Sequence, residues 1–330
     1  MKNFVKLIGI AALVAIIGFS FAACGGGGNP TKTQETPQTP GSTTWTTTDT
    51  YGDLRKIAWG NSKFVAKGNG GKTAYSSDGI TWTEVTDSAL VSHEIEDIAW
   101  GNNKFVAVGS SDMSYSSDGV TWTAVVDSTS TLVGFRAIAW GDDKFVAVGY
   151  GGKIVYSADG VTWTAVADST FDTSIILSSL AWGGGKFVAG GWKGKMAYSS
   201  DGITWTAVAD STFGSSNDSD IENIAWGGGK FVAVGYFDSI HNHVAYSADG
   251  VTWTTVTADF IGVSGGIAWG NDKFVYGCGP SVWYSANGIT WTKEILMKNG
   301  KDGYFLGRDI AWGNNRFVAV SSDPGIWYSN

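Results

Sequence analysis

The chain has 330 residues, a formal net charge of −8, 43% hydrophobic residues and 16% charged residues. It is long enough to bury a substantial core, and an acidic chain without a basic stripe argues against nucleic acid and against adhesion to anionic lipid. Only two cysteines are present, so the fold has to be stable without a set of disulfides.

The first 23 residues have the pattern of a secretory signal. Lys2 and Lys6 precede an uncharged apolar stretch, and small residues then lead into Cys24. Such a segment is excluded from fold reasoning. Residues 21–24, Phe-Ala-Ala-Cys, resemble the bacterial lipobox, which usually has Leu at the position of Phe21. The resemblance implies that Cys24 is lipidated, and that the protein is exported and anchored to the cell envelope at the outer membrane or cell surface.

Residues 24–42 read as a flexible tether. The segment contains a run of glycines after Cys24, followed by Pro30, Pro37 and Pro40 among Thr and Gln residues. This composition buries too little apolar surface to order itself. We therefore expect a signal peptide at 1–23, a lipidated tether at 24–42 and one folded domain at 43–330.

The folded domain repeats a unit of about 40 residues, a period typical of repeat architectures. Each copy opens with Ile or Leu followed by Ala-Trp-Gly, continues with Lys or Arg before Phe-Val, and then reaches Tyr-Ser. The seven openings begin at Ile57, Ile98, Ile138, Leu180, Ile224, Ile267 and Ile310.

Each unit contains four short strand patterns. In the third unit they cover 137–140, 144–149, 153–157 and 162–166, which are rich in Val, Ile, Phe, Tyr, Trp and Thr and separated by turn residues. The second strand is apolar on both faces, as expected for a strand covered on both sides by neighbouring sheets. No segment has sustained helical periodicity. The pattern predicts an all-β, seven-bladed β-propeller with four-stranded antiparallel blades.

The two ends of the domain complement each other. The last unit stops at Asn330 without a fourth strand, whereas residues 44–47, Thr-Trp-Thr-Thr, look like a fourth strand without a unit. We expect residues 43–48 to complete the last blade, which closes the ring and leaves no long unpaired edge. A closed ring of this kind is expected to be a monomer.

The turn between the third and fourth strands carries a recognisable motif. Residues 76–82, Ser-Ser-Asp-Gly-Ile-Thr-Trp, resemble a shortened Asp-box, or BNR repeat, of sialidase-like propellers. Further copies begin at Ser116, Ser157, Ser199, Ser247 and Ser285. The aspartate is expected to cap its own turn by accepting backbone N–H bonds. In that family the motif lies on the face away from the active site, so it indicates fold rather than function.

Function is therefore expected on the opposite face, in the loops that join strands two to three and strands four to one. Two residues before each opening Ile or Leu, the seven units carry Arg55, Glu96, Arg136, Ser178, Glu222, Gly265 and Arg308. The three arginines suit an anion or carboxylate site at the mouth of the central channel. Alternatively, arginine and glutamate pair across blades and the ring is structural.

Aromatic residues also interrupt the repeat on this face. Tyr150, Trp192 and Tyr236 begin the second-to-third-strand loops of three consecutive units, and Phe237 follows Tyr236. Exposed aromatics of this kind would bind a sugar ring or a protein. The alternative is that the same side chains pack loop against loop.

The sequence favours a non-enzymatic binding propeller that recognises a protein or glycan through this loop face. The alternatives are a carbohydrate-active hydrolase of the sialidase-like type, which would use Arg55, Arg136 and Arg308, and an assembly or scaffold factor for envelope complexes. A sialidase would usually have Arg-Ile-Pro near its start, whereas this chain has Arg-Lys-Ile at 55–57. We expect no cofactor, no metal, no nucleic-acid partner, and membrane contact only through the lipid on Cys24.

Overall fold

The computed structural model describes residues 44–48, 54–85, 94–126, 132–209, 213, 219–238, 241–260, 265–279, 281–298, 301–302, 307–321 and 325–330. The expected signal peptide, Cys24 and tether lie outside these residues. In the described part of the chain, the single helical turn is η1 (Asn69–Gly71) and all other regular structure is β. No helix in that part has the length and apolar character needed to cross a membrane.

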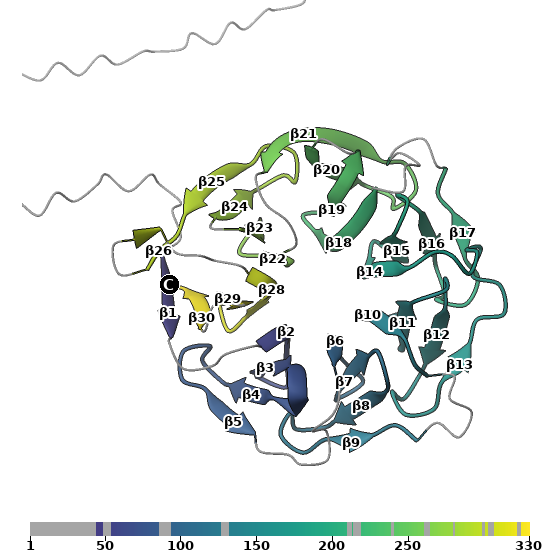
Figure 1. Ribbon diagram of the computed structural model, residues 1–330, viewed down its shortest axis with the longest axis horizontal. Helices are drawn as coiled ribbons and strands as arrows, with labels where there is room; N and C mark the ends of the chain where they lie inside the picture. The colour runs from purple at the N-terminus through teal and green to yellow at the C-terminus, as the bar shows by residue number, and fades with distance from the viewer. Residues whose placement is uncertain are drawn as a thin grey trace, which may run out of the picture. The chain divides into compact units, whose positions relative to one another are not determined.

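Seven four-stranded antiparallel sheets surround a common centre, as the sequence predicts (Figure 1). In each blade the first strand lies nearest the centre and the fourth is outermost. Blades one to three are β2 (Leu54–Gly60), β3 (Lys63–Gly68), β4 (Thr73–Ser76) and β5 (Thr83–Val85); β6 (Ile95–Gly101), β7 (Lys104–Gly109), β8 (Met113–Ser116) and β9 (Thr123–Ala124); β10 (Phe135–Gly141), β11 (Lys144–Gly149), β12 (Ile154–Ser157) and β13 (Thr164–Ala165).

The fourth, fifth and sixth blades follow the same order, and the fifth has the longest strands. They are β14 (Leu177–Gly183), β15 (Lys186–Gly191), β16 (Met196–Ser199) and β17 (Thr206–Ala207); β18 (Asp220–Gly227), β19 (Lys230–Asp238), β20 (His241–Ser247) and β21 (Thr254–Phe260); β22 (Ile267–Gly270), β23 (Lys273–Cys278), β24 (Ser281–Ser285) and β25 (Thr292–Ile295). A short hairpin of β26 (Met297–Lys298) and β27 (Lys301–Asp302) comes after the sixth blade.

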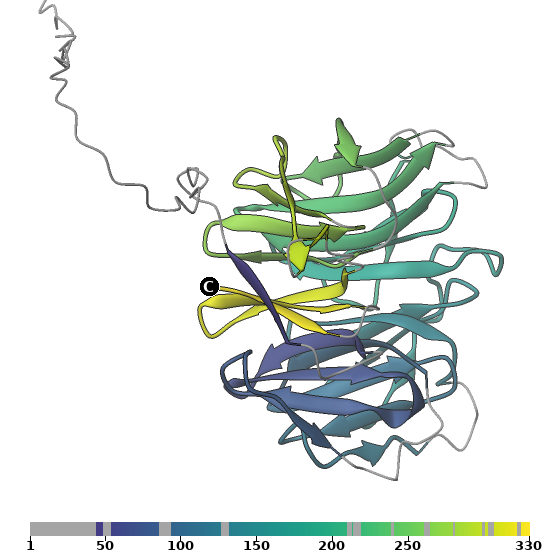
Figure 2. The same ribbon diagram turned by 60° about the vertical axis from the view of Figure 1, so that its left-hand side comes forward.

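Both ends of the domain build the seventh blade. Its strands are β28 (Gly307–Gly313), β29 (Arg316–Ser321) and β30 (Ile326–Ser329), followed by β1 (Trp45–Thr48) from the N-terminal side. Trp45 is paired with Ser329 and Thr48 with Ile326 in an antiparallel register (Figure 2). The predicted closure of the ring is therefore confirmed.

The opening Ile-Ala-Trp-Gly motif holds adjacent blades together. The tryptophan of each first strand lies against the glycine that ends the first strand of the preceding blade. A Cβ atom on Gly183 would come within 2.0 Å of Cγ of Trp226. The same contact joins Gly313 of the last blade to Trp59 of the first. Only glycine lets an indole approach the backbone this closely.

The hydrophobic core is divided among the seven interfaces between blades. Each interface has its own cluster of buried side chains. The cluster between the last and first blades contains Val318 and Val320 of β29 together with Ile57 and Phe64. Second strands are buried on both faces apart from their first residue, as their uninterrupted apolar sequence predicts.

The hairpins between third and fourth strands are capped by their own aspartates. Asp78 Oδ1 accepts hydrogen bonds from the backbone N–H groups of Ile80 and Thr81, each at 2.8 Å. Burial opposes the charge, but these bonds outweigh it and lower the pKa of Asp78. The corresponding aspartates, and Asn287 in the sixth blade, make the same two bonds. The expected turn capping is therefore confirmed.

The fourth strand of the third blade is shorter than the sequence suggested. In the third blade the strand covers Thr164–Ala165, not 162–166. In the first blade the tryptophan before the fourth strand belongs to the turn, because the indole of Trp82 donates a hydrogen bond to the carbonyl of Gly79 at 3.2 Å. Trp205 and Trp253 make the same bond in the fourth and fifth blades.

Replacing Gly183 by Ala is expected to destabilise the domain by about 1–3 kcal/mol, because the new methyl group would overlap the indole of Trp226. Gly185→Ala is a matched control: Gly185 has a φ of +75° but no atom within 4 Å of a Cβ position, so only backbone strain of about 1 kcal/mol is expected. Chemical unfolding would compare the two variants. Equal stability losses would contradict the packing role of Gly183.

Deleting residues 44–48 is expected to leave β30 unpaired and to produce a less stable protein that aggregates. Deleting residues 25–40, which removes no residue of β1, should leave the melting temperature unchanged. Size-exclusion chromatography and thermal melting would compare the two deletions. A monomeric, fully stable protein without 44–48 would show that β1 does not support the ring.

Candidate functional site

A break in strand pairing recurs at the start of the first strands and directs side chains to the centre. In six blades the pairing between the first and second strands skips one residue. The skipped residues are Arg55, Glu96, Arg136, Ser178, Glu222 and Arg308. A β-bulge of this kind leaves one residue outside the ladder and re-aims its side chain. The skipped residues are six of the seven residues that lie two positions before an opening Ile or Leu, and the seventh is Gly265.

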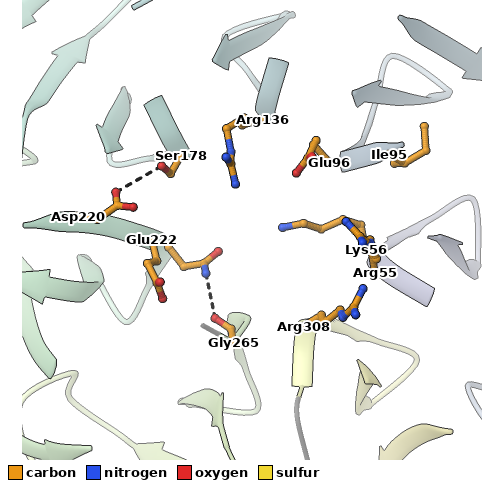
Figure 3. Close-up of a pocket in the computed structure, with 11 residues that line it drawn as sticks. Arg55, Lys56, Ile95, Glu96, Arg136, Ser178, Asp220, Glu222, Gly265 and Arg308 are labelled. Carbon is orange, nitrogen blue, oxygen red and sulfur yellow. Dashed lines mark hydrogen bonds between the residues drawn. The ribbon is translucent and has the colours of Figure 1, made fainter. Parts of the chain in front are cut away.

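These side chains line one pocket at the mouth of the central channel, here called the mouth pocket (Figure 3). Its volume is about 330 Å³. Besides the six bulged residues, the lining contains Lys56, Ile95, Asp220, Asn223 and Gly265. The three arginines predicted as candidate ligand-binding residues, Arg55, Arg136 and Arg308, are thus brought together in one place.

Two of the arginines are not neutralised by the glutamates of the ring. Among the described residues, no ion pair involves Arg55 or Arg136, and Nε of Arg55 is buried without a hydrogen-bond partner. Arg136 Nη1 donates a hydrogen bond to the hydroxyl of Tyr150 at 3.1 Å, and Glu96 accepts one from Ser110 at 3.5 Å. Pairing of Arg and Glu across blades therefore does not explain these two arginines.

A second layer of charge lies below the mouth pocket, at the positions just before each opening Ile or Leu. Lys56, Asp97 and Asp309 line a smaller cavity of about 150 Å³. The carboxylates also hold blades together: Asp309 accepts the backbone N–H of Ile57 at 2.9 Å, and Asp97 accepts that of Ile138 at 2.8 Å. In both cases the bond crosses to the next blade, so the channel wall depends on these carboxylates.

The charges of this layer are coupled. Burial opposes the positive charge of Lys56, but Asp309 and Asp97 outweigh it and raise the pKa of the lysine. Burial raises the pKa of Asp97 to about 6, against the opposing effect of Lys56. Burial also raises the pKa of Asp309, again against the opposing effect of Lys56. Burial in the wall therefore raises the pKa of both carboxylates above their usual value.

Exposed aromatic side chains lie on the same face of the ring as the mouth pocket. Tyr150 is 41% exposed and Trp192 is 44% exposed. Each is held at the backbone by the entry to the next blade, through β-bridges from Tyr150 to Ile176 and from Trp192 to Asp220. They follow the ends of the second strands, whereas the Asp-capped hairpins join third to fourth strands. In an antiparallel blade these two positions lie on opposite faces.

The structure does not treat all four predicted aromatic residues alike. Tyr236 is half-buried, and burial followed by the charge of Glu222 raises its pKa. Phe237 is only 5% exposed and packs edge-on against Phe213, with ring centroids 4.9 Å apart. The pairing of β19 with β20 skips Phe237, and a bulge of this kind re-aims the side chain, here into the core. The prediction of Phe237 as an exposed binding residue is wrong.

The structure also reveals residues that the sequence analysis did not select. Asp220 joins the lining of the mouth pocket, where it accepts a hydrogen bond from the hydroxyl of Ser178 at 3.3 Å. Lys67 is fully buried, and its ammonium lies 3.4 Å from the ring centroid of Trp122 in the next blade. The signal for Lys67 was available, because lysine replaces the Val or Gly that other units have near the end of this strand.

Metal binding has no visible basis in the described part of the chain. No group of three His, Cys, Asp or Glu side chains gathers there as a metal ion would require. The side chains of His241 and His243 lie outside the described part of the structure.

No protein-family model and no curated protein matches the chain. Solved structures do match it over most of its length. YCF48 bound to D1 peptide has a TM-score of 0.66 and 14% identity, covering 86% of this chain and 96% of its own. YCF48 from Cyanidioschyzon merolae has 0.63 and 16%, covering 87% and 98%. Virginiamycin B lyase from Staphylococcus aureus has 0.68 and 8%, covering 88% and 99%. At these identities the likeness shows the propeller fold alone.

Asp97→Asn is expected to change how stability depends on pH. The raised pKa means that Asp97 favours the folded state fully below pH 3.8 and that this contribution is lost as the pH rises through about 6. Asparagine does not titrate, so it loses no stability over this range. The free energy of unfolding of the variant, relative to that of the wild type, should therefore rise by up to about 1–2 kcal/mol between pH 4 and pH 7. Urea unfolding at several pH values would measure it.

Asp201→Asn is the matched control for this experiment. Backbone hydrogen bonds, which outweigh burial, lower the pKa of Asp201 to about 2. Its contribution is present above pH 3.8 and lost only as the pH falls toward 2. The stability difference for Asp201→Asn should therefore stay nearly constant between pH 5 and pH 7. A constant difference for Asp97→Asn as well would contradict the raised pKa.

Proposed function

We propose that the protein is a non-enzymatic binding propeller of the cell envelope, which holds a protein or glycan on the face opposite the Asp-capped hairpins. One observation supports this most directly: Arg55 and Arg136, neither in an ion pair among the described residues, line one pocket, and exposed Tyr150 and Trp192 lie on the same face. Arginine and large aromatic side chains are the residues that most often dominate binding energy at protein interfaces.

The rigidity of this face supports the same proposal. Tyr150 and Trp192 sit on backbone segments that pair with the next blade, and the hydroxyl of Tyr150 is fixed by Arg136. A binding surface that is already ordered loses less conformational entropy when a partner arrives. The arrangement is thus suited to binding without rearrangement of the ring.

The proposal includes the Asp-box resemblance, a lipid anchor, and the division of the chain into signal peptide, tether and folded domain. The lipobox-like residues 21–24, followed by a Gly- and Pro-rich segment, support an exported domain at 43–330 tethered through Cys24. A monomer is proposed because the closed ring leaves no long strand edge for a second copy.

A hydrolase of the sialidase-like type, or a scaffold role in envelope complexes, would use the same face. The fold does not decide among these functions, because the matching structures include one named as a lyase and one described as bound to a peptide. A glycan array and a peptide array would search for the partner. A fluorogenic sialoside assay would test hydrolysis, and turnover that disappears in Arg136→Gln would overturn the non-enzymatic proposal.

Trp192→Ala is expected to weaken binding of a partner found on either array by about 1–3 kcal/mol, while changing the free energy of unfolding by less than about 1 kcal/mol. Trp327→Ala is the matched control, because Trp327 is the same residue type but is buried; it should cost about 3–5 kcal/mol of stability. Titration and thermal melting would measure both. A large stability loss in Trp192→Ala with unchanged affinity would remove this surface as the site.

Cys24→Ser is expected to release the protein from the membrane fraction or to block processing of the precursor, because serine has no thiol to carry a lipid. Fractionation of cells and intact-mass measurement would test this. Unchanged mass and unchanged membrane partition would show that Cys24 is not the anchor, without affecting the proposal for the loop face.

A further inference from the structure

The mouth pocket has two electrically different sides (Figure 3). On one side lie the cationic side chains of Arg55, Lys56, Arg136 and Arg308, with Glu96 as the single anion among them. On the other side lie Asp220 and Glu222 of the fifth blade. We call these the arginine side and the acidic side. The two groups therefore face each other across one small cavity.

The arginine side has capacity left for a ligand. Among the described residues, Arg136 makes a side-chain hydrogen bond only to Tyr150, and Arg55 has a buried Nε without a partner. A buried guanidinium nitrogen without an acceptor is unfavourable. An anionic group in the pocket would accept hydrogen bonds from the guanidinium groups that line it, and a carboxylate fits the planar fork of arginine.

The acidic side can accept a cation. Asp220 accepts one hydrogen bond from Ser178, at 3.3 Å, and a carboxylate has room for several. Burial raises the pKa of Asp220 while Ser178 and Arg136 oppose the shift, so a neighbouring cation would stabilise its charged form. Glu222 lies on the same strand, two residues further on, and points into the same cavity (Figure 3).

The sixth blade leaves this pocket open next to the acidic side. Its first strand begins only at Ile267, and Gly265 stands where other blades have a bulged side chain. A Cβ on Gly265 would lie 1.5 Å from the carbonyl oxygen of Gly277, so no larger residue fits that backbone. The amide of Asn223 donates to the carbonyl of Gly265 at 2.9 Å and holds this opening in place.

We propose that the mouth pocket binds a small zwitterion of the amino-acid or short-peptide type, with its carboxylate on the arginine side and its ammonium group on the acidic side. The cavity of about 330 Å³ lies at the small end of the range typical of small-molecule sites. The inference deepens the proposed function, because it names the ligand chemistry of the same face. It differs from a plain anion site in requiring both charges of the ligand.

Isothermal titration calorimetry with alanine, dialanine and trialanine would test the proposal on the purified full chain. At least one of the three should bind, and the length that binds best reports the span between the two sides. N-acetylation removes the ammonium group and C-terminal amidation removes the carboxylate. Each change should weaken binding about tenfold or more, because it removes a charged hydrogen bond. No binding at any length, or equal binding of the acetylated form, would overturn the proposal.

Two variants assign the ends of the ligand. Arg136→Gln should abolish the difference between the free and amidated peptides, and Asp220→Asn should abolish the difference between the free and acetylated ones. Lys186→Gln is the matched control, because it removes one positive charge at the start of β15, on the opposite face. It should bind like the wild type. If Arg136→Gln and Lys186→Gln weaken binding equally, the effect is one of net charge and the site assignment fails.

The outcome is separable from that of the proposed function. If the zwitterions fail to bind while Trp192→Ala still weakens a partner found on the arrays, only the ligand chemistry of the mouth pocket is wrong. If zwitterions bind and no array partner is found, the mouth pocket stands as a small-molecule site and the macromolecular role falls.

Discussion

The contact on which the structure depends is a tryptophan lying on a glycine of the preceding blade. It occurs at every interface, from Gly60 with Trp100 through to Gly313 with Trp59. The indole supplies a large apolar area, and the absent side chain lets it reach the backbone. Since the seventh contact joins the last blade to the first, the ring closes with the same geometry that it uses throughout. No interface has to be distorted to complete the circle.

Because packing between blades is carried by repeated residues, the residues that vary are free to face the channel and the loops. The β-bulge at the head of each first strand is the device that turns them inward. It occurs in six blades and places Arg, Glu or Ser in the lining of the mouth pocket. The scaffold therefore presents a ring of independently variable positions, and the identity of each side chain changes the charge of the mouth pocket without changing the core.

The fold was predictable from sequence because a weak strand pattern becomes a strong signal when it occurs seven times. Ring closure was predictable because the last unit lacks a fourth strand and a fourth-strand motif precedes the first unit. The ring of Arg55, Arg136 and Arg308 was found by the same reasoning. The β-bulge that turns these side chains inward was not predicted. A Gly or Ser ends most second strands opposite the bulge, and this residue is a sequence signal for it. A Cβ on Gly109 would lie 2.1 Å from the carbonyl oxygen of Glu94. The prediction for Phe237 was wrong for another reason. A departure from the repeat shows that a residue is unusual, but it does not show which face of its strand the side chain occupies.

The pairing of β1 with β30 has a consequence for biogenesis. A ribosome makes the chain from its N-terminus, so the first strand of the domain is finished while its partner, 278 residues away in the Thr48–Ile326 contact, does not yet exist. Blades one to six can assemble in order from local hairpins, but the seventh blade cannot be completed until β30 has been made. A chain that lacked β30 would leave β1 without its strand partner. The stability of the ring therefore depends on contacts between residues far apart in the sequence, and it is gained in one step when the last of them forms.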